Sequence, residues 1–176
     1  TPTTMGFKFE ENGINFIKID KINLDGNIRF NKLKKISRDC HSSLKRSQLK
    51  ENDILFSIAG SLGTICIVPK ELLPCNTNQA LAIIRLKKDI DHNFVLKILR
   101  SSNILKQIQA KKVGFAQFNL SLVDIKELVI PFPNKENQKS ILNKIYKFEN
   151  LILESEKNIS VNKNEIENLI NEFWIK

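Results

Sequence analysis

The last quarter of the chain carries the most regular hydrophobic pattern. From Glu136 to Trp174 there is no proline or glycine, and apolar residues recur at alternating spacings of three and four. This heptad repeat predicts one long helix with an apolar seam along its length. The expected seam residues are Ile141, Ile145, Phe148, Ile152, Ile159, Ile166, Leu169 and Phe173, with the polar Ser155 and Asn162 in the middle.

Such a helix spans about 60 Å, roughly twice the width of the domain that the preceding residues could build. It cannot bury its whole seam against its own domain. We therefore expect a partner helix from a second copy or a similar chain, with Ser155 and Asn162 fixing the register. The alternative is a helix that folds back on a small core, and the pattern leaves the orientation of a pair open.

Shorter alternating runs precede the helix. Residues 14–20 predict a strand, and a turn over 24–27 leads into a second short run. Residues 53–59 and 64–68 predict two buried strands joined by a tight glycine turn, and residues 80–86 predict another strand. These elements indicate a β-rich domain built largely from hairpins.

Helical signals follow the strands. Asp91 or Asn93 can cap a helix whose apolar face we expect in the core. That face consists of Phe94, Ile98, Leu105 and Ile108. Ser121 and Asp124 resemble a capping box that starts a one-turn helix before a strand over 128–130. The fold class expected is therefore α+β, one domain followed by one long helix.

Charge is unevenly distributed between these two parts. The 176 residues carry a net charge of +9, and residues 136–176 hold 6 Lys or Arg against 7 Asp or Glu. That leaves 22 basic against 12 acidic residues for positions 1–135. A basic domain on a nearly neutral helix indicates a polyanion held by the domain and a protein held by the helix.

The most basic segment runs from Arg29 to Lys50 and is rich in serine. We expect a phosphate-gripping surface there, with serine hydroxyls as additional donors. The alternative is a solvated connection. The candidate phosphate contacts are Lys32, Lys34, Lys35, Arg38 and Arg46.

A second candidate is the loop over 111–119, which combines cations, aromatic rings and amides. Lys111 and Lys112 could grip a nucleic-acid backbone, and Gln117 and Asn119 carry amides that can bond adenine bidentately. Ser61, at the tip of the glycine turn, is expected to approach base edges as well.

Other chemistry is not supported. Cys40, Cys66 and Cys75 are odd in number and lack Cys-x-x-Cys spacing, which predicts reduced thiols instead of a zinc site or a disulfide framework. No nucleotide-binding glycine loop, amino-methyl-transfer motif or nucleophile–base pair is found, so we expect no cofactor and no catalysis. No apolar run approaches 18 residues and no signal peptide opens the chain, which predicts a cytoplasmic protein without membrane contact. The opening at Thr1, with Met5 the only methionine, leads us to expect preceding residues.

Taken in order, several motifs resemble the specificity subunit of type I restriction-modification systems, in particular one target recognition domain with its following helix. They are Thr1-Pro2, Ile14 to Asp20, Leu49-x-x-x-Asp53-Ile54-Leu55-x-Ser57-x-x-Gly60-x-x-Gly63, Asn78-Gln79, Gly114-x-x-Gln117-x-x-Leu120-Ser121, and Ile130-Pro131-Phe132-Pro133 with Gln138-x-x-Ile141. Asn134 and Asn137 depart from the family pattern at the entry to the helix.

The resemblance implies a mixed-sheet DNA target recognition domain over residues 1–133 and a spacer and dimerisation helix over 134–176. It implies a non-catalytic subunit that binds double-stranded DNA and works with methyltransferase subunits and a restriction motor subunit. Members usually have two recognition domains and two antiparallel helices. This chain has one of each, so we expect either a half-subunit that pairs as a homodimer or with a second recognition half, or a fragment.

Two other interpretations stay open. One is a coiled-coil scaffold whose basic domain binds an acidic protein. The other is the recognition domain of a single-chain restriction-methylation enzyme. The target sequence does not follow from residue types, because base contacts depend on loop geometry and DNA shape.

Overall fold

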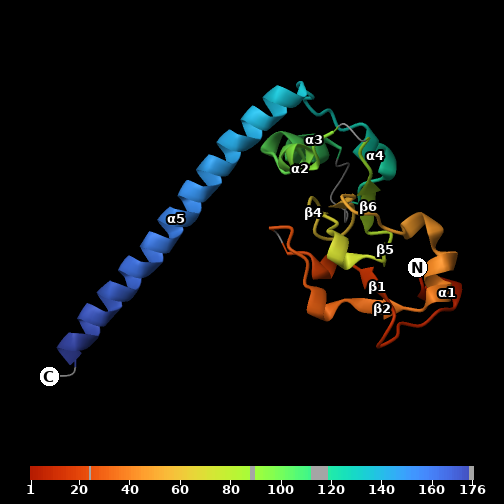
Figure 1. Ribbon diagram of the computed structural model, residues 1–176, viewed down its shortest axis with the longest axis horizontal. Helices are drawn as coiled ribbons and strands as arrows, with labels where there is room; N and C mark the ends of the chain where they lie inside the picture. Colours follow the sequence, from red (N-terminus) through yellow and green to blue (C-terminus); the bar gives the residue numbers. More distant parts are fainter. Residues whose placement is uncertain (24, 88–89, 112–118, 175–176) are drawn as a thin grey trace. The chain divides into compact units, whose positions relative to one another are not determined.

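The computed structural model describes residues 1–23, 25–87, 90–111 and 119–174 (Figure 1). The chain divides into two compact units, Thr1–Phe132 and Pro133–Lys176. The first holds all the strands and short helices of the described residues, and the second consists mainly of one long helix. The expected α+β class, a mixed-sheet domain followed by one long helix, is confirmed.

One sheet of the first unit has the strand order β2-β1-β5. Strand β1 (Ile14–Ile17) pairs antiparallel with β2 (Lys34–Ile36) and parallel with β5 (Cys75–Thr77). The sequence pattern indicated β1 but neither of its neighbours. Both are three residues long, and β5 contains the polar pair Asn76 and Thr77 where apolar alternation would be expected.

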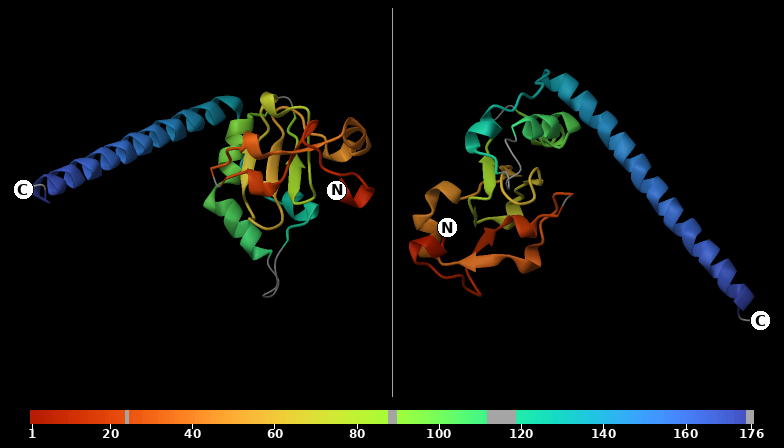
Figure 2. Two further views of the ribbon diagram at one scale, coloured as in Figure 1. Left: turned by 90° about the horizontal axis from the view of Figure 1, so that it is seen from below. Right: turned by 180° about the vertical axis from the view of Figure 1, so that it is seen from behind.

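The second sheet is antiparallel, with the order β4-β3-β6. Strands β3 (Ile54–Ser57) and β4 (Ile65–Ile67) form the predicted hairpin, and β6 (Leu81–Ile84) is the predicted strand that follows. Figure 2 shows these strands side by side within the first unit. All four side chains of β3 are buried, as its central position requires.

Three apolar clusters hold the first unit together. One joins β1 and β5 to β3 and β4, and a second packs β3, β4 and β6 against α2 (His92–Leu99) and α3 (Ser102–Ala110). A third packs α1 (Arg38–Ser43) on β1 and β2. The sheets therefore lie between α1 on one side and α2 with α3 on the other (Figure 1).

The single helix expected after Asp91 is instead a pair of helices. Asp91 does cap α2, accepting a hydrogen bond from the backbone N–H of Phe94 at 3.0 Å. Ser101 then adopts an extended conformation, with φ −69° and ψ 153°, which ends the first helix and allows α3 to start afresh. Because of this break, Leu105 is 43% exposed, and its expected place in the core is wrong.

The structure also corrects the strand expected over 128–130. Helix α4 (Leu122–Lys126) begins with the predicted capping box, but no strand follows it in the described part of the chain. The side-chain amide of Gln107 takes the place of a neighbouring strand. It donates to the carbonyl of Val129 at 2.9 Å and accepts from its N–H at 2.8 Å.

Helix α5 (Lys135–Trp174) is 40 residues long, as the heptad repeat predicts. The side chain of Asn134 accepts from the N–H of Asn137 at 2.9 Å and so caps its first turn. All residues from 150 to 174 are exposed, including the apolar ones. No helix of the described residues is long and apolar enough to cross a membrane.

Short 3-10 turns complete the chain. They are η1 (Thr3–Met5), η2 (Ile19–Lys21), η3 (Phe30–Lys32), η4 (Lys45–Ser47) and η5 (Lys70–Leu72).

Candidate nucleic-acid interface

A groove of about 950 Å³ opens in the first unit beside strand β6. One wall is formed by residues 43–47, the end of α1 with η4. The other is formed by residues 77–79, which connect the two sheets, and by residues 81–83 of β6. Basic, hydroxyl, amide and apolar side chains thus line one opening.

The basic wall is anchored by a buried amide. Asn76 of β5 is fully buried, and its side-chain nitrogen donates to the carbonyl of Leu44 at 3.0 Å and to the hydroxyl of Ser47 at 2.9 Å. Its oxygen accepts a hydrogen bond from Nδ1 of His41. The Gln48 side chain adds a bond to the His41 carbonyl at 2.7 Å. These bonds fix part of the segment for which the sequence predicts a phosphate-gripping surface, with a solvated connection as the alternative, on strand β5.

Two cations of this wall are available to a ligand. Lys45 and Arg46 are exposed and line the groove, and neither forms an ion pair with another described residue. The sequence selected Arg46 as a phosphate contact and missed Lys45, its immediate neighbour. Ser47, Asn78 and Gln79 line the same groove. The sequence included Ser47 only among the serines of the basic segment, and it noted Asn78 and Gln79 only as a family motif.

Lys34 and Lys35 do not share one surface, because adjacent residues of a strand point to opposite faces of a sheet. Lys34 pairs with Phe16 of β1 and places its ammonium 4.5 Å from the centroid of the Phe9 ring. Lys35 pairs with Asn15 and donates to its side-chain oxygen at 3.2 Å. The structure therefore separates two residues that the sequence grouped together.

The remaining candidates of the basic segment and the glycine turn are dispersed. Arg38 is exposed in the first turn of α1. Lys32 ends η3, and its side chain lies outside the description. Ser61 is exposed between β3 and β4 and is not among the residues that line the groove.

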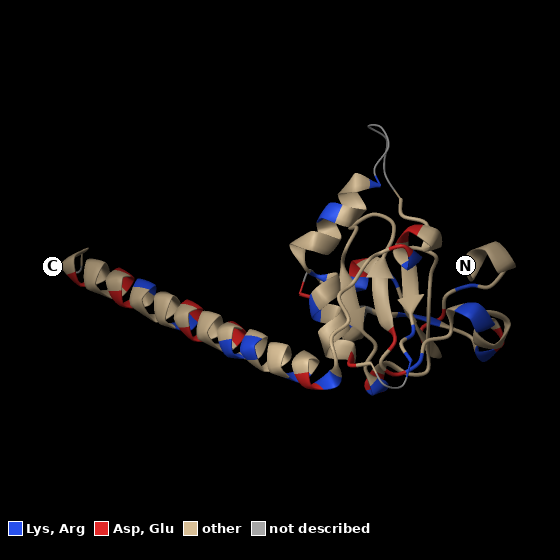
Figure 3. Cartoon of the chain, turned by 90° about the horizontal axis from the view of Figure 1, so that it is seen from above, with Lys and Arg blue, Asp and Glu red and all other residues tan. Residues whose placement is uncertain are grey.

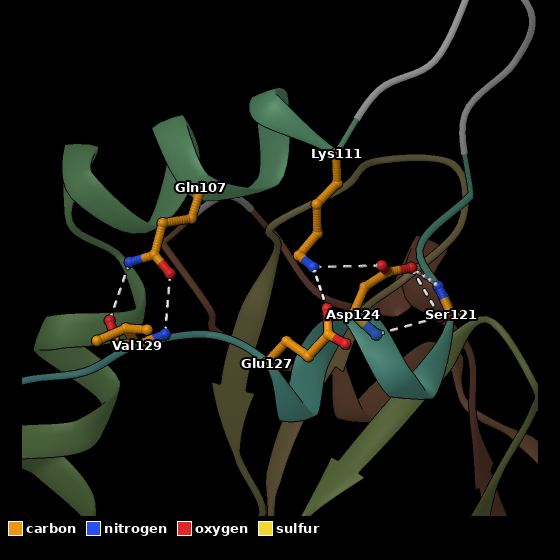
Figure 4. A network of polar contacts seen from close by, with 6 residues as sticks. All are labelled: Gln107, Lys111, Ser121, Asp124, Glu127 and Val129. Atoms are coloured by element: carbon orange, nitrogen blue, oxygen red, sulfur yellow. Dashed lines mark hydrogen bonds and ion pairs between the residues drawn. The ribbon is translucent and has the colours of Figure 1, made fainter.

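The loop over 111–119 is described only at its two ends. Lys112 and Gln117 lie outside the described residues, and Asn119 is exposed. Lys111 places its ammonium 2.5 Å from a carboxylate oxygen of Glu127 and 3.5 Å from one of Asp124 (Figure 4). Lys111 is therefore already held by two carboxylates.

Hydrogen bonds in this network shift two pKa values. The bond to Glu127 raises the pKa of Lys111, and the bonds from Ser121 lower the pKa of Asp124. Both groups stay charged near neutral pH. The ion pairs then join the end of α3 to α4, on either side of the candidate loop (Figure 4).

The described residues contain neither a candidate metal site nor a disulfide. No group of three or more His, Cys, Asp or Glu side chains comes together there. Cys40, Cys66 and Cys75 are buried free thiols, as the sequence predicts.

The described residues thus combine a small mixed-sheet unit, whose groove includes Lys45 and Arg46, with a long helix that carries exposed apolar residues. Two solved structures share this fold. The HsdS subunit from Thermoanaerobacter tengcongensis matches 96% of this chain and 42% of its own, with a TM-score of 0.72 and 19% identity. A structure describing complex assembly and conformational transition of the type I R-M system matches 89% of this chain and 40% of its own, with a TM-score of 0.67 and 21% identity.

Sequence comparison identifies the family. Residues 3–168 match the profile of the type I restriction modification DNA specificity domain, and the chain belongs to this family. A curated relative, the type I restriction enzyme EcoBI specificity subunit of Escherichia coli, is 34% identical over 139 residues, or 77% of this chain. The chain spans 28% of that relative's length.

Proposed function

We propose that this chain is the DNA-reading part of a type I specificity subunit. It selects a sequence in double-stranded DNA for methyltransferase subunits and for a restriction motor subunit, and it carries out no catalysis itself. The observation that carries this proposal is the family match over residues 3–168. The open basic wall at Lys45 and Arg46 supports it, because phosphate contacts dominate the affinity of proteins for DNA. The proposal includes a cytoplasmic location.

In this proposal the two parts of the chain divide the work. Residues 1–133 form the DNA target recognition domain, and residues 134–176 form the spacer and pairing helix. Phosphate contacts come from the basic segment, including Arg38 and Arg46. The 111–119 loop, with Gln117 and Asn119, reads base edges.

Pairing through α5 is supported by its exposed apolar seam. Ile152, Ile159 and Ile166 are each more than half exposed. Phe148, Leu169 and Phe173 continue the same seam and are also exposed, at 63%, 58% and 83%. A stripe of this length on a separate helix fits a second helix of the same pattern.

Charge along α5 favours an antiparallel pair. Residues 135–147 hold four Lys against one Glu, and residues 149–172 hold six Glu against two Lys (Figure 3). Antiparallel pairing therefore sets the basic half of one helix against the acidic half of the other. Parallel pairing would instead set the two basic halves against each other and the two acidic halves against each other, and like charges repel.

Full overlap of the seams gives one antiparallel register. In it Ile159 lies against Ser155 of the partner, and Ile152 lies against Asn162 of the partner, so neither polar residue meets its own copy. The same register brings Lys144 near the partner's Glu172 and Glu149 near the partner's Lys163 at flanking positions, where opposite charges select partners and orientation.

The DNA-binding proposal is tested by titrating fluorescent duplex DNA with the chain at several salt concentrations. Arg46→Ala should lower the slope of log affinity against log salt by about 0.9, the value for one lost phosphate contact. Gln117→Ala should relax one base preference and leave that slope unchanged.

Two results would contradict the proposal. If both variants weaken binding to all sequences equally, the loop does not read bases. If duplex DNA does not bind and an acidic protein does, the chain is the scaffold considered as the alternative.

A further inference from the structure

We propose that the groove beside β6 holds one strand of the DNA target, and that buried Asn76 is the positioning residue that fixes the distance between its walls. The inference rests on the proposed DNA-binding function and deepens it. It adds Lys45, Ser47, Asn78 and Gln79 to the contacts expected from the sequence.

A single residue connects the two walls. The backbone of Asn76 continues directly into Thr77, Asn78 and Gln79 of one wall, while its side chain holds Leu44 and Ser47 of the other. The wall that contains residues 77–79 has its own anchor, because the Thr77 hydroxyl donates to the carbonyl of Ile17 in β1 at 3.1 Å. The separation of the walls is therefore set through β5.

The network around Asn76 leaves little freedom for the basic wall. Both hydrogens of the amide nitrogen go to acceptors, so the amide oxygen must accept from His41, whose Nδ1 carries the hydrogen. The Ser47 hydroxyl accepts from Asn76 and donates to the Leu44 carbonyl at 3.1 Å. Buried polar networks of this kind are rigid when every member is satisfied.

The chemistry of the lining fits a nucleic-acid strand. Lys45, Arg46 and the Ser47 hydroxyl are the groups that contact phosphates, and no Asp or Glu is found among the described lining residues. This favours an anion over a cation as the ligand.

The opposite wall supplies amides. The Asn78 oxygen accepts from the N–H of Ala80 at 3.3 Å, while its amide nitrogen has no partner within the described part of the chain. Gln79 is exposed. Amides of this kind can bond base edges or sugar oxygens. The phosphates would thus lie along residues 45–47, with the bases toward 78–79.

The test measures duplex DNA affinity against salt for the full chain and three variants. Lys45→Ala combined with Arg46→Ala should lower the slope by about 1.8, because two phosphate contacts are lost. Asn76→Ala should also lower the affinity for DNA and the slope, as the double variant does, although it removes no charge. Adding Asn76→Ala to the Lys45/Arg46 double variant should cause little further loss, since its effect acts through those residues.

Gln107→Ala is the matched control. It also removes a side-chain amide that both donates and accepts hydrogen bonds, in this case with the carbonyl and N–H of Val129, but Gln107 is not among the residues that line the groove, so the slope should stay unchanged. If Asn76→Ala does not fold, His41→Ala removes one partner of the same amide without touching the groove. It should give a smaller loss of the same kind.

The outcomes separate this inference from the proposed function. Absence of DNA binding by the unchanged chain would overturn the function itself. Salt-dependent binding that is insensitive to the Lys45/Arg46 change would overturn only the groove. If the loss of affinity from Asn76→Ala adds fully to the loss from the Lys45/Arg46 change, Asn76 does not act through those residues and is needed only for folding.

Discussion

At the residue scale, the absence of a side chain at Gly26 allows two distant segments to lie in contact. Its φ is +80°, and the Arg100 guanidinium passes beside it to donate to the carbonyls of Asp25 at 2.8 Å and Ile65 at 2.9 Å. A Cβ at this position would lie 2.0 Å from the guanidinium nitrogen and 2.4 Å from the Ile65 oxygen. The turn can therefore lie against β4 only because the residue is glycine.

We predict that Gly26→Ala lowers the free energy of unfolding by about 2–4 kcal/mol, from backbone strain together with overpacking. Gly60→Ala is the control, because its φ is +73° but no atom lies within 4 Å of the added Cβ. It should cost only about 1 kcal/mol. Denaturant titration measures both, and equal losses would show that the close approach to Arg100 carries no weight.

The buried thiols give the molecule a pH dependence at the alkaline end. Burial raises the pKa of Cys66 and Cys75 from 9.0 to about 12. Below pH 9 the thiols are neutral in both the folded and the unfolded chain. Above pH 9 the unfolded thiols ionise and the folded ones do not, so stability is lost as the pH rises.

We predict a fall in the free energy of unfolding of about 1.4 kcal/mol per pH unit for each thiol between pH 9 and 12. Other groups titrate in the same range, so the measurement compares denaturant titrations of the unchanged chain and Cys66→Ala. The variant should show a shallower slope by the contribution of one thiol. Parallel curves would mean that Cys66 ionises as easily in the folded state.

At the scale of elements, α5 carries most of the exposed large apolar side chains of the described residues. Ile152 and Leu153 are neighbours with similar exposure, 57% and 62%, but only Ile152 belongs to the seam. The pairing proposal therefore makes different predictions for two adjacent substitutions.

We predict that Ile152→Asp halves the particle mass in solution and that Leu153→Asp leaves the pair intact. Orientation is checked by joining Lys144→Cys with Glu172→Cys, which should cross-link two copies on mild oxidation if the helices are antiparallel. The native thiols are buried and should not interfere. If the unchanged chain has the mass of a monomer in solution, the pairing proposal is wrong. If it is a dimer but the cross-link does not form, the antiparallel register is wrong.

The elements that could be predicted are those whose signals are local. The hairpin of β3 and β4 follows from two apolar runs around a glycine turn, and α5 follows from its heptads. Strand β5 could not be found this way, because its partner β1 lies about 60 residues upstream and its polar side chains bond other segments. The strand predicted over 128–130 is wrong because the Gln107 side chain, and no neighbouring strand, bonds the backbone of Val129. Hydrophobic periodicity does not reveal such a bond.

The candidate site was predicted less well for the same reason. Composition selected the basic segment, but strand alternation sends Lys34 and Lys35 to opposite faces. Only the fold shows that Lys45 and Arg46 face Asn78 and Gln79 across a groove. The adjacent pair Asn78 and Gln79, at the start of a strand, was the available signal.

At the scale of the whole molecule, the chain combines a basic unit with a helix whose charges change sign along its length. This arrangement suits a reader that holds DNA with one part and sets the spacing of two readers with the other. Two-fold pairing would give two half-sites at a fixed separation, by the geometry that matches dimeric proteins to palindromic sites.

The most direct test is selection from a random duplex library by the purified chain, alone and with the proposed methyltransferase subunit, at low and near-physiological salt. We predict enrichment of two short, inverted blocks with a constant gap between them. Salt-sensitive binding that enriches no sequence, even with the methyltransferase present, would contradict this prediction, because only phosphate attraction would then remain.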